Sequence, residues 1–229
     1  MTHGAQGAHA LVSIIMPVFN DAEWVSRALQ SCIDQTHGAI EVIVVDDAST
    51  DNTVEIVNEF AQSDPRIILI SLENNLSALT ARRVGIDAAH GEYIMFLDGD
   101  DELVSTACET VVSKAHETRA DLVGFGSLVV SPDGSTGSHY ENSMQPKHTE
   151  LFGNDVLESL FPVGQNAQGQ LWRYLFKRSI LVRAYASLPQ DLVLPRMNDL
   201  PVAFLAAMHA KHYVSVKNRL YRYFFRRGA

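Results

Sequence analysis

The sequence lacks the features that mark membrane-spanning, secreted and zinc-binding proteins. No apolar run in it approaches the ~20 residues that a bilayer-spanning helix needs. Its two cysteines, Cys32 and Cys108, do not have Cys-x-x-Cys spacing, and residues 1–10 carry neither the basic nor the apolar region of a secretory signal. We therefore expect a cytoplasmic protein of a reducing compartment, without a disulfide framework or a zinc site.

Acidic residues are missing from the end of the chain, and basic ones are few at its beginning. The net charge of −9 argues against nucleic-acid binding. Asp and Glu outnumber Lys and Arg by 18 to 5 over residues 1–116, whereas no acidic residue follows Leu200. The tail from Lys217 to Arg227 interleaves five basic residues with four aromatic ones. This tail favours either peripheral contact with an anionic membrane surface, at the inner face of the membrane, or a sheet edge with solvated side chains.

Strand and helix patterns alternate along the first half of the chain. We expect strands at 12–17, 41–45, 66–72 and 93–97 and helices at 21–35, 53–62 and 76–89, the first of them capped by Asp21. Because the strands are continuous runs of Val, Ile and Leu, the sheet should be mostly parallel and doubly wound, with helices on both faces. With 229 residues, one domain covering 1–229 is the better expectation.

Patterns in the second half are less regular. Helices are expected at 105–119, 154–161, 177–186 and 198–211, and strands at 121–130, 213–216 and 220–224. Residues 131–148 are rich in Ser, Gly, His and Asn and indicate a loop.

Three of the four strands in the first half end in polar or acidic residues, at 19–20, 46–47 and 98–101. Ligands bind outside the carboxyl ends of strands in open α/β sheets, so this edge is the predicted site. The carboxylates of Asp98, Asp100 and Asp101 suit Mg²⁺ or Mn²⁺, and Gly99 lets the backbone approach a ligand closely. The competing interpretation is an ordinary acidic turn.

Two further observations bear on this edge. No glycine-rich phosphate loop follows the first strand, so a phosphate-bearing ligand would need a metal ion instead. Asp46 and Asp47 are two adjacent carboxylates, more than a helix cap needs, and could accept the N–H of a nucleobase. Residues 49–51 are better explained as a helix cap.

Several motifs, in order, resemble the family-2 inverting glycosyltransferases of GT-A fold. The clearest are SIIMPVFN (13–20), SCIDQT (31–36), EVIVVDDASTDNT (41–53) and GEYIMFLDGDD (91–101). The resemblance covers 11–103 and continues more weakly at 171–178, 198–199 and 220–223. It implies a nucleotide-sugar-binding half at 11–103 and a smaller acceptor-binding half at 104–229.

The resemblance also implies residue roles. Asp100 would bind Mn²⁺ or Mg²⁺, Asp98 would share the metal or hold the donor, and Asp199 would be the catalytic base. Arg82 would reach the donor phosphate or sugar. The donor pocket would be completed by residues at the strand ends: Pro17, Val18, Phe19, Asn20, Asp47 and Gly99. The implied reaction moves a sugar from a nucleotide-diphosphate donor, a UDP-sugar by resemblance, to a hydroxyl of a saccharide or lipid-linked acceptor in cell-surface polysaccharide or glycoconjugate synthesis.

Departures from the family pattern keep alternatives open. The family usually has Asn at the positions of Arg83 and Arg173, and Glu at the position of Asn198. It also often has a Gly in the segment 74–77, which contains no Gly in this chain. A non-catalytic nucleotide-sugar-binding domain is therefore the main rival, and a nucleotidyltransferase is a weaker one. Trp172 could stack on a sugar or belong to the core. His209 and His212 have the spacing of a metal pair but are better explained as helix-end residues.

Overall fold

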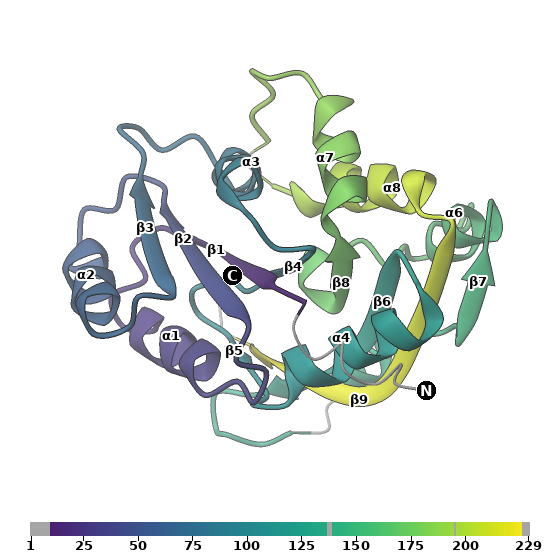
Figure 1. Ribbon diagram of the computed structural model, residues 1–229, viewed down its shortest axis with the longest axis horizontal. Helices are drawn as coiled ribbons and strands as arrows, with labels where there is room; N and C mark the ends of the chain where they lie inside the picture. Colours follow the sequence, from purple (N-terminus) through teal and green to yellow (C-terminus); the bar gives the residue numbers. More distant parts are fainter. Residues whose placement is uncertain (1–9, 137–138, 195, 226–229) are drawn as a thin grey trace.

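A single twisted sheet runs through the computed structural model, which describes residues 10–136, 139–194 and 196–225 (Figure 1). Within these residues the sheet has nine strands, in the order β3-β2-β1-β4-β8-β6-β9-β5, and β7 pairs with β9. The elements up to the acidic turn are β1 (Val12–Val18), α1 (Val25–Ile33), β2 (Ile40–Asp46), α2 (Thr53–Ser63), β3 (Ile67–Ser71), α3 (Ala78–Ala88) and β4 (Tyr93–Phe96).

The remaining elements extend the same sheet. They are β5 (Glu102–Leu103), α4 (Ala107–Thr118), β6 (Leu122–Val130), α5 (His139–Ser143), β7 (Glu150–Phe152), α6 (Asp155–Leu160), the 3-10 turn η2 (Leu171–Arg173), β8 (Tyr174–Lys177), α7 (Arg178–Ala186), α8 (Asp199–His209) and β9 (His212–Phe224). The four strands β3, β2, β1 and β4 are parallel, whereas β8 runs antiparallel to β4 and β6. The predicted parallel sheet is thus confirmed for the first half, and the second half is mixed.

Helices cover both faces of the sheet, as expected from strands that are apolar on both sides. Alternate residues of β1 point to opposite faces: Ile14 and Met16 belong to a core with α1, α2 and α4, and Ile15 to a core with α3, α7 and α8. Figure 1 shows α3, α7 and α8 together on one side, away from α1 and α2. Both cysteines are buried and unpaired, as expected. No helix in the described part of the chain is long and apolar enough to cross a membrane.

The structure corrects several of the expected boundaries. Asp21 does not cap the first helix, which begins at Val25; its carboxylate instead accepts a hydrogen bond from the Phe19 N–H. The segment 131–148 is not all loop, because it contains α5. The two strands expected at 213–216 and 220–224 are one strand, β9, whose register against β6 shifts around Gly126 and so absorbs the polar residues between them. The short strands β5, β7 and β8 were not expected, and Lys177, expected in a helix, is the last residue of β8.

Candidate active site

The carboxyl ends of β1, β2 and β4 meet, as the sequence predicts. Val18 at the end of β1 pairs with Asp46 of β2, and the Asp47 N–H donates to the Val18 carbonyl at 2.9 Å. The turn at 98–101 follows β4 directly. A Cβ on Gly99 would lie 2.7 Å from Asp21 Oδ2 and 2.8 Å from Val18 Cγ1, so only glycine allows the turn to pack this closely against the end of β1. The close approach that Gly99 permits is therefore to the protein itself.

Arg82 joins the acidic turn to the start of α8. Its Nη2 donates to Asp98 Oδ1 at 3.0 Å, and its Nη1 donates to Asp199 Oδ1 at 2.6 Å. Nη1 also donates to Asn198 Oδ1 at 2.9 Å. The guanidinium is buried, with 5% of the side chain exposed, against 30% for Asp98 and 21% for Asp199. Residues far apart in the sequence thus form one charged cluster, which we call the Arg82 cluster: Arg82, Asp98, Asn198 and Asp199.

Asp199 does not cap its own helix. The first turn of α8 receives no side-chain cap hydrogen bond, and the second carboxylate oxygen of Asp199 accepts the Leu171 N–H at 3.2 Å. The carboxylate is therefore held from outside the helix, by Arg82 and by η2.

Electrostatic repulsion is concentrated at the acidic turn. Burial raises the pKa of Asp98 to about 6 against the opposing effect of Arg82, and the charges of Asp199 and Asp100 add to the increase. Burial also raises the pKa of Asp101 to about 8, and the charges of Asp100 and Asp98 act in the same direction. Arg82 carries one positive charge against several carboxylates, so an additional cation at this turn would be electrostatically favoured.

The chemistry of the turn fits a metal ion that arrives with a phosphate ligand. Within the described residues, no group of three or more His, Cys, Asp or Glu side chains could hold a metal alone. Asp98 and Asp100 are both partly exposed and offer two carboxylates. Mg²⁺ is typically held by one or two carboxylates and completes its coordination with water and substrate phosphates.

The end of β2 is also tied to neighbouring loops. Both carboxylate oxygens of Asp47 accept backbone N–H groups, of Leu76 at 2.7 Å and Ser77 at 2.9 Å. Asp46 accepts the Ser49 N–H at 3.1 Å. Asp47 therefore fixes the loop before α3. Its predicted hydrogen bond to a nucleobase would either share the carboxylate with these two N–H groups or replace one of them.

The other predicted donor residues differ in their exposure. Pro17 and Val18 are buried within β1, whereas Phe19 is 45% exposed at its end. The Asn20 N–H donates to Ser49 Oγ at 2.9 Å, and Asn20 Oδ1 accepts the Thr50 N–H at 2.8 Å. Residues 49–51 were expected mainly as a helix cap, but the N-cap of α2 is Asn52, which makes no side-chain cap hydrogen bond. Ser49 and Thr50 instead fix the loop after β1. The roles of all these residues in donor binding stay predictions.

Strained backbone is concentrated around this edge. Among the described non-glycine residues with positive φ are Asn20 (56°), Ala48 (64°), Ser77 (85°) and Met197 (53°). They follow β1, follow β2, precede α3 and precede Asp199, respectively. Such conformations are typical of functional sites, where surrounding contacts hold them.

Three residues that the sequence left open have structural roles. Trp172 is buried and stacks on Tyr221, with ring centroids 4.7 Å apart, so it belongs to the core. His212 is the first residue of β9 and not a helix-end residue as expected, and its Nε2 lies 2.8 Å from Glu150 Oε1. Arg173 is buried, and its guanidinium donates to the Gln145 carbonyl and the side chains of Gln168 and Gln170. Tyr221 was not predicted as a site residue, yet its hydroxyl contacts the acidic turn. Its position in the weak 220–223 motif was the available signal.

Comparisons with known proteins agree with this geometry. The sequence profile of glycosyl transferase family 2 matches residues 13–178. The glycosyltransferase EpsJ of Bacillus subtilis is 31% identical over 214 residues, which cover 93% of this chain and 60% of EpsJ. The GalNAc(5)-diNAcBac-PP-undecaprenol beta-1,3-glucosyltransferase of Campylobacter jejuni is 31% identical over 171 residues, covering 74% of this chain and 52% of that protein.

The fold is shared with a solved structure. The crystal structure of S. aureus TarS 1–349 in complex with UDP-GlcNAc superposes with a TM-score of 0.76 at 21% identity, covering 96% of this chain and 60% of that one. This likeness confirms the predicted GT-A type of fold. The chain spans about 60% of the length of EpsJ and of the TarS chain. Because the family profile matches most of the sequence, the chain belongs to glycosyl transferase family 2.

Proposed function

We propose that this chain is a metal-dependent inverting glycosyltransferase domain that transfers a sugar from a UDP-sugar to a hydroxyl of a saccharide or lipid-linked acceptor. The observation that carries the proposal is the Arg82 cluster. It holds a carboxylate suited to proton abstraction, Asp199, on the same guanidinium as a carboxylate of the acidic turn, Asp98. This arrangement supports the proposal, because transfer from a nucleotide diphosphate requires a base close to the group that binds the diphosphate.

In this mechanism Asp199 accepts the proton of the acceptor hydroxyl as its oxygen attacks the anomeric carbon and the bond to the diphosphate breaks. Arg82 and the Leu171 N–H orient the Asp199 carboxylate for this step. Asp100, with Asp98, would hold Mn²⁺ or Mg²⁺. Such an ion, when bound, neutralises charge on the leaving diphosphate.

The departures from the family pattern leave the Arg82 cluster complete. Asn198, in place of the usual Glu, contributes its Oδ1 to Arg82. Arg83 donates to the Pro189 carbonyl at 2.9 Å, outside the cluster. Arg173 donates to the Gln145 carbonyl and the Gln168 side chain, and so links the segment 131–148 to the segment 162–170. We propose that these two segments close over the substrates and exclude water. These contacts support the catalytic interpretation over a binding-only domain.

The proposal is tested by calorimetry of UDP with the wild type and Asp100→Asn, in Mn²⁺ and in EDTA. The wild type should bind UDP more tightly in Mn²⁺, and Asp100→Asn should lose that difference. Equal wild-type affinity in Mn²⁺ and EDTA would remove the metal from the proposal. A thermal-shift panel of nucleotide sugars would identify the donor, because a ligand at a hundredfold excess over its Kd stabilises by ~2.7 kcal/mol.

Membrane contact through the basic tail is a separate proposal. Two of its arginines are paired with acidic side chains, Arg219 with Glu141 and Arg222 with Glu102, although about half of each arginine remains exposed. Arg226 and Arg227 lie outside the described residues. Co-sedimentation with liposomes should increase with anionic lipid and fall with salt. No binding at low salt would reject this proposal.

A further inference from the structure

The acidic turn is held from behind by the last strand of the sheet. The hydroxyl of Tyr221, in β9, donates to Asp101 Oδ2 at 2.8 Å and accepts the Asp98 N–H at 3.2 Å. The Phe224 N–H donates to the other oxygen of Asp101 at 2.8 Å. Since the Asp101 N–H also donates to the Asp98 carbonyl at 3.0 Å, one phenol hydroxyl connects both ends of a closed turn. Asp100 lies between these two ends.

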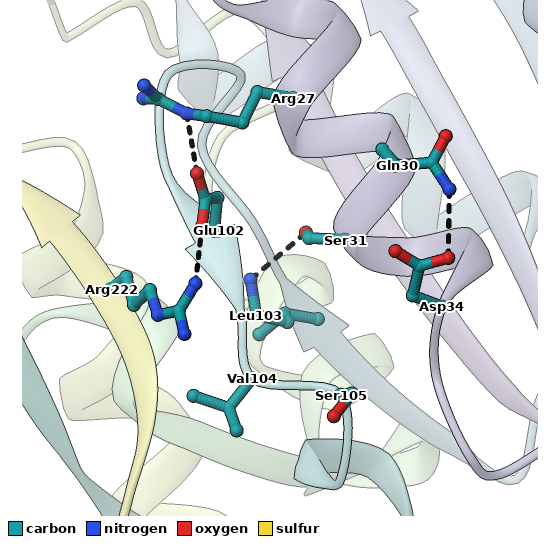
Figure 2. Close-up of a pocket in the computed structure, with 9 residues that line it drawn as sticks. All are labelled: Arg27, Gln30, Ser31, Asp34, Glu102, Leu103, Val104, Ser105 and Arg222. Carbon is teal, nitrogen blue, oxygen red and sulfur yellow. Dashed lines mark hydrogen bonds and ion pairs between the residues drawn. The ribbon is translucent and has the colours of Figure 1, made fainter.

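A second set of contacts holds the same turn beside β9. Glu102 of β5 lies between Arg27 of α1 and Arg222 of β9 (Figure 2). Its Oε1 is 2.7 Å from Arg27 Nε, and its Oε2 is 2.9 Å from Arg222 Nη1. Arg27 also donates through Nη2 to the Asp100 carbonyl at 3.0 Å. These side chains also line an open pocket of about 320 Å³. The main chain of Asp100 is thus anchored, and its position depends on β9 as well as on α1.

Tyr221 is itself fixed in position. Its side chain is fully buried, and its ring stacks on Trp172 at an interplanar angle of 19°. Trp172 lies in η2, next to Leu171, whose N–H binds the Asp199 carboxylate. A buried hydroxyl with two partners makes stronger hydrogen bonds than an exposed one, because the local dielectric constant is low. The same packed unit therefore contacts both the acidic turn and the proposed base.

We propose that Tyr221 is a positioning residue for divalent-cation binding: its hydroxyl fixes the turn so that Asp100 faces the cation and the diphosphate it accompanies. The inference rests on the proposed function, in which Asp100 holds the ion. Mg²⁺ requires near-octahedral geometry, and residues that orient a ligand from behind typically contribute 10–100-fold to metal affinity. The inference also gives the 220–223 motif a physical role.

The test is Tyr221→Phe, which keeps the ring stacked on Trp172 and removes only the hydroxyl. Calorimetry with UDP should show about 10–100-fold weaker binding in Mn²⁺ than for the wild type, and unchanged binding in EDTA. Tyr213→Phe is the matched control, because it removes another buried phenol hydroxyl of β9, one that is not hydrogen-bonded to the turn. Its binding of UDP in Mn²⁺ should equal that of the wild type.

The outcomes separate the two proposals. Wild-type binding that does not depend on Mn²⁺ would overturn the proposed metal role itself. Wild-type Mn²⁺ dependence that Tyr221→Phe retains in full would overturn the role of Tyr221, and so would an equal loss in both Phe variants. If thermal unfolding shows that Tyr221→Phe does not fold, Asp101→Asn replaces it. That change replaces one accepting oxygen with an amide N–H₂ group, so the side chain can no longer accept from both the Tyr221 hydroxyl and the Phe224 N–H. It should therefore also weaken Mn²⁺-dependent binding, and unchanged binding would reject the inference.

Discussion

Arg82 and Asp199 are 117 positions apart in the sequence, and Arg82 Nη1 lies 2.6 Å from Asp199 Oδ1. The same guanidinium binds Asp98 at 3.0 Å through Nη2. Its two ends thus hold one carboxylate from each half of the chain. Arg82 was expected to reach a donor phosphate; in this structure it organises the carboxylates, and a phosphate contact would have to share or replace one of these pairs.

Replacing Arg82 should destabilise the fold and the site together. Arg82→Met leaves two carboxylates without their cation, and we expect a loss of about 2–3 kcal/mol of unfolding free energy. This is below the ~3–5 kcal/mol typical of fully buried pairs, because Asp98 and Asp199 keep some contact with water. Denaturant unfolding measures the change. Arg83→Met is the matched control and should cost less than ~1 kcal/mol; an equal effect of both variants would contradict the role assigned to Arg82.

Replacing Asp199 should remove catalysis and spare donor binding. Asp199→Asn keeps an oxygen for the Leu171 N–H but cannot accept the acceptor's proton, so transfer should slow on the order of 10²–10⁴-fold. Initial rates with a nucleotide-sugar donor measure this, and calorimetry should show donor affinity within a few-fold of the wild type. Asp191→Asn, in the exposed loop before α8, is the control. Turnover of Asp199→Asn close to that of the wild type would exclude Asp199 as the base.

Relieving backbone strain at the end of β2 should stabilise the protein. Ala48 adopts φ 64°, a left-handed conformation that disfavours every residue with a Cβ. We expect Ala48→Gly to gain about 0.5–1 kcal/mol, since relief of strain exceeds the entropy that glycine adds to the unfolded chain. Thermal and denaturant unfolding measure the gain. Ala61→Gly in α2 is the opposite control and should lose about 1 kcal/mol. A loss at Ala48 would show that the strain is not stored there.

Glu41 should make stability depend on acid pH. Burial alone would raise its pKa, but hydrogen bonds from Ser13 Oγ at 2.6 Å and from the N–H groups of His90 and Gly91 outweigh burial and lower it. Because the folded pKa lies below the unfolded value of ~4.3, this stabilisation is present above that pH and is lost as pH falls through the folded pKa. Glu41→Gln should cost about 1–2 kcal/mol at neutral pH and flatten the acid limb of the stability profile.

The measurement for Glu41 is the unfolding free energy across neutral to acid pH. Glu23→Gln, at an exposed position before α1, should leave both the neutral stability and the acid limb as in the wild type. Parallel acid limbs for Glu41→Gln and the wild type would show that the hydrogen bonds to Glu41 do not favour its charged form.

Local sequence patterns were enough to predict the four parallel strands of the first half and the edge on which the candidate site lies. The strands that end at Val18, Asp46 and Phe96 are almost entirely apolar. Such runs predict strands of a parallel sheet, because these strands are buried on both faces. Carboxyl ends of parallel strands meet at one edge, so the proximity of residues 19–20, 46–47 and 98–101 followed from the pattern alone. Boundaries failed where a polar residue had a partner outside its own segment, as Asp21 has in the loop after β1.

Long-range partners were decided only by the tertiary structure. The sequence could place Arg82 on a helix and Asp199 at the start of another, yet it could not show that one guanidinium joins Asp199 to Asp98, because that contact depends on how α3, α8 and β4 pack. The hydroxyl of Tyr221 is a second case: it reaches the acidic turn because β9 inserts between β6 and β5. The spacing of apolar residues along an element specifies which of its faces is buried. The partner of a buried polar side chain depends instead on which distant segment of the chain packs against that face.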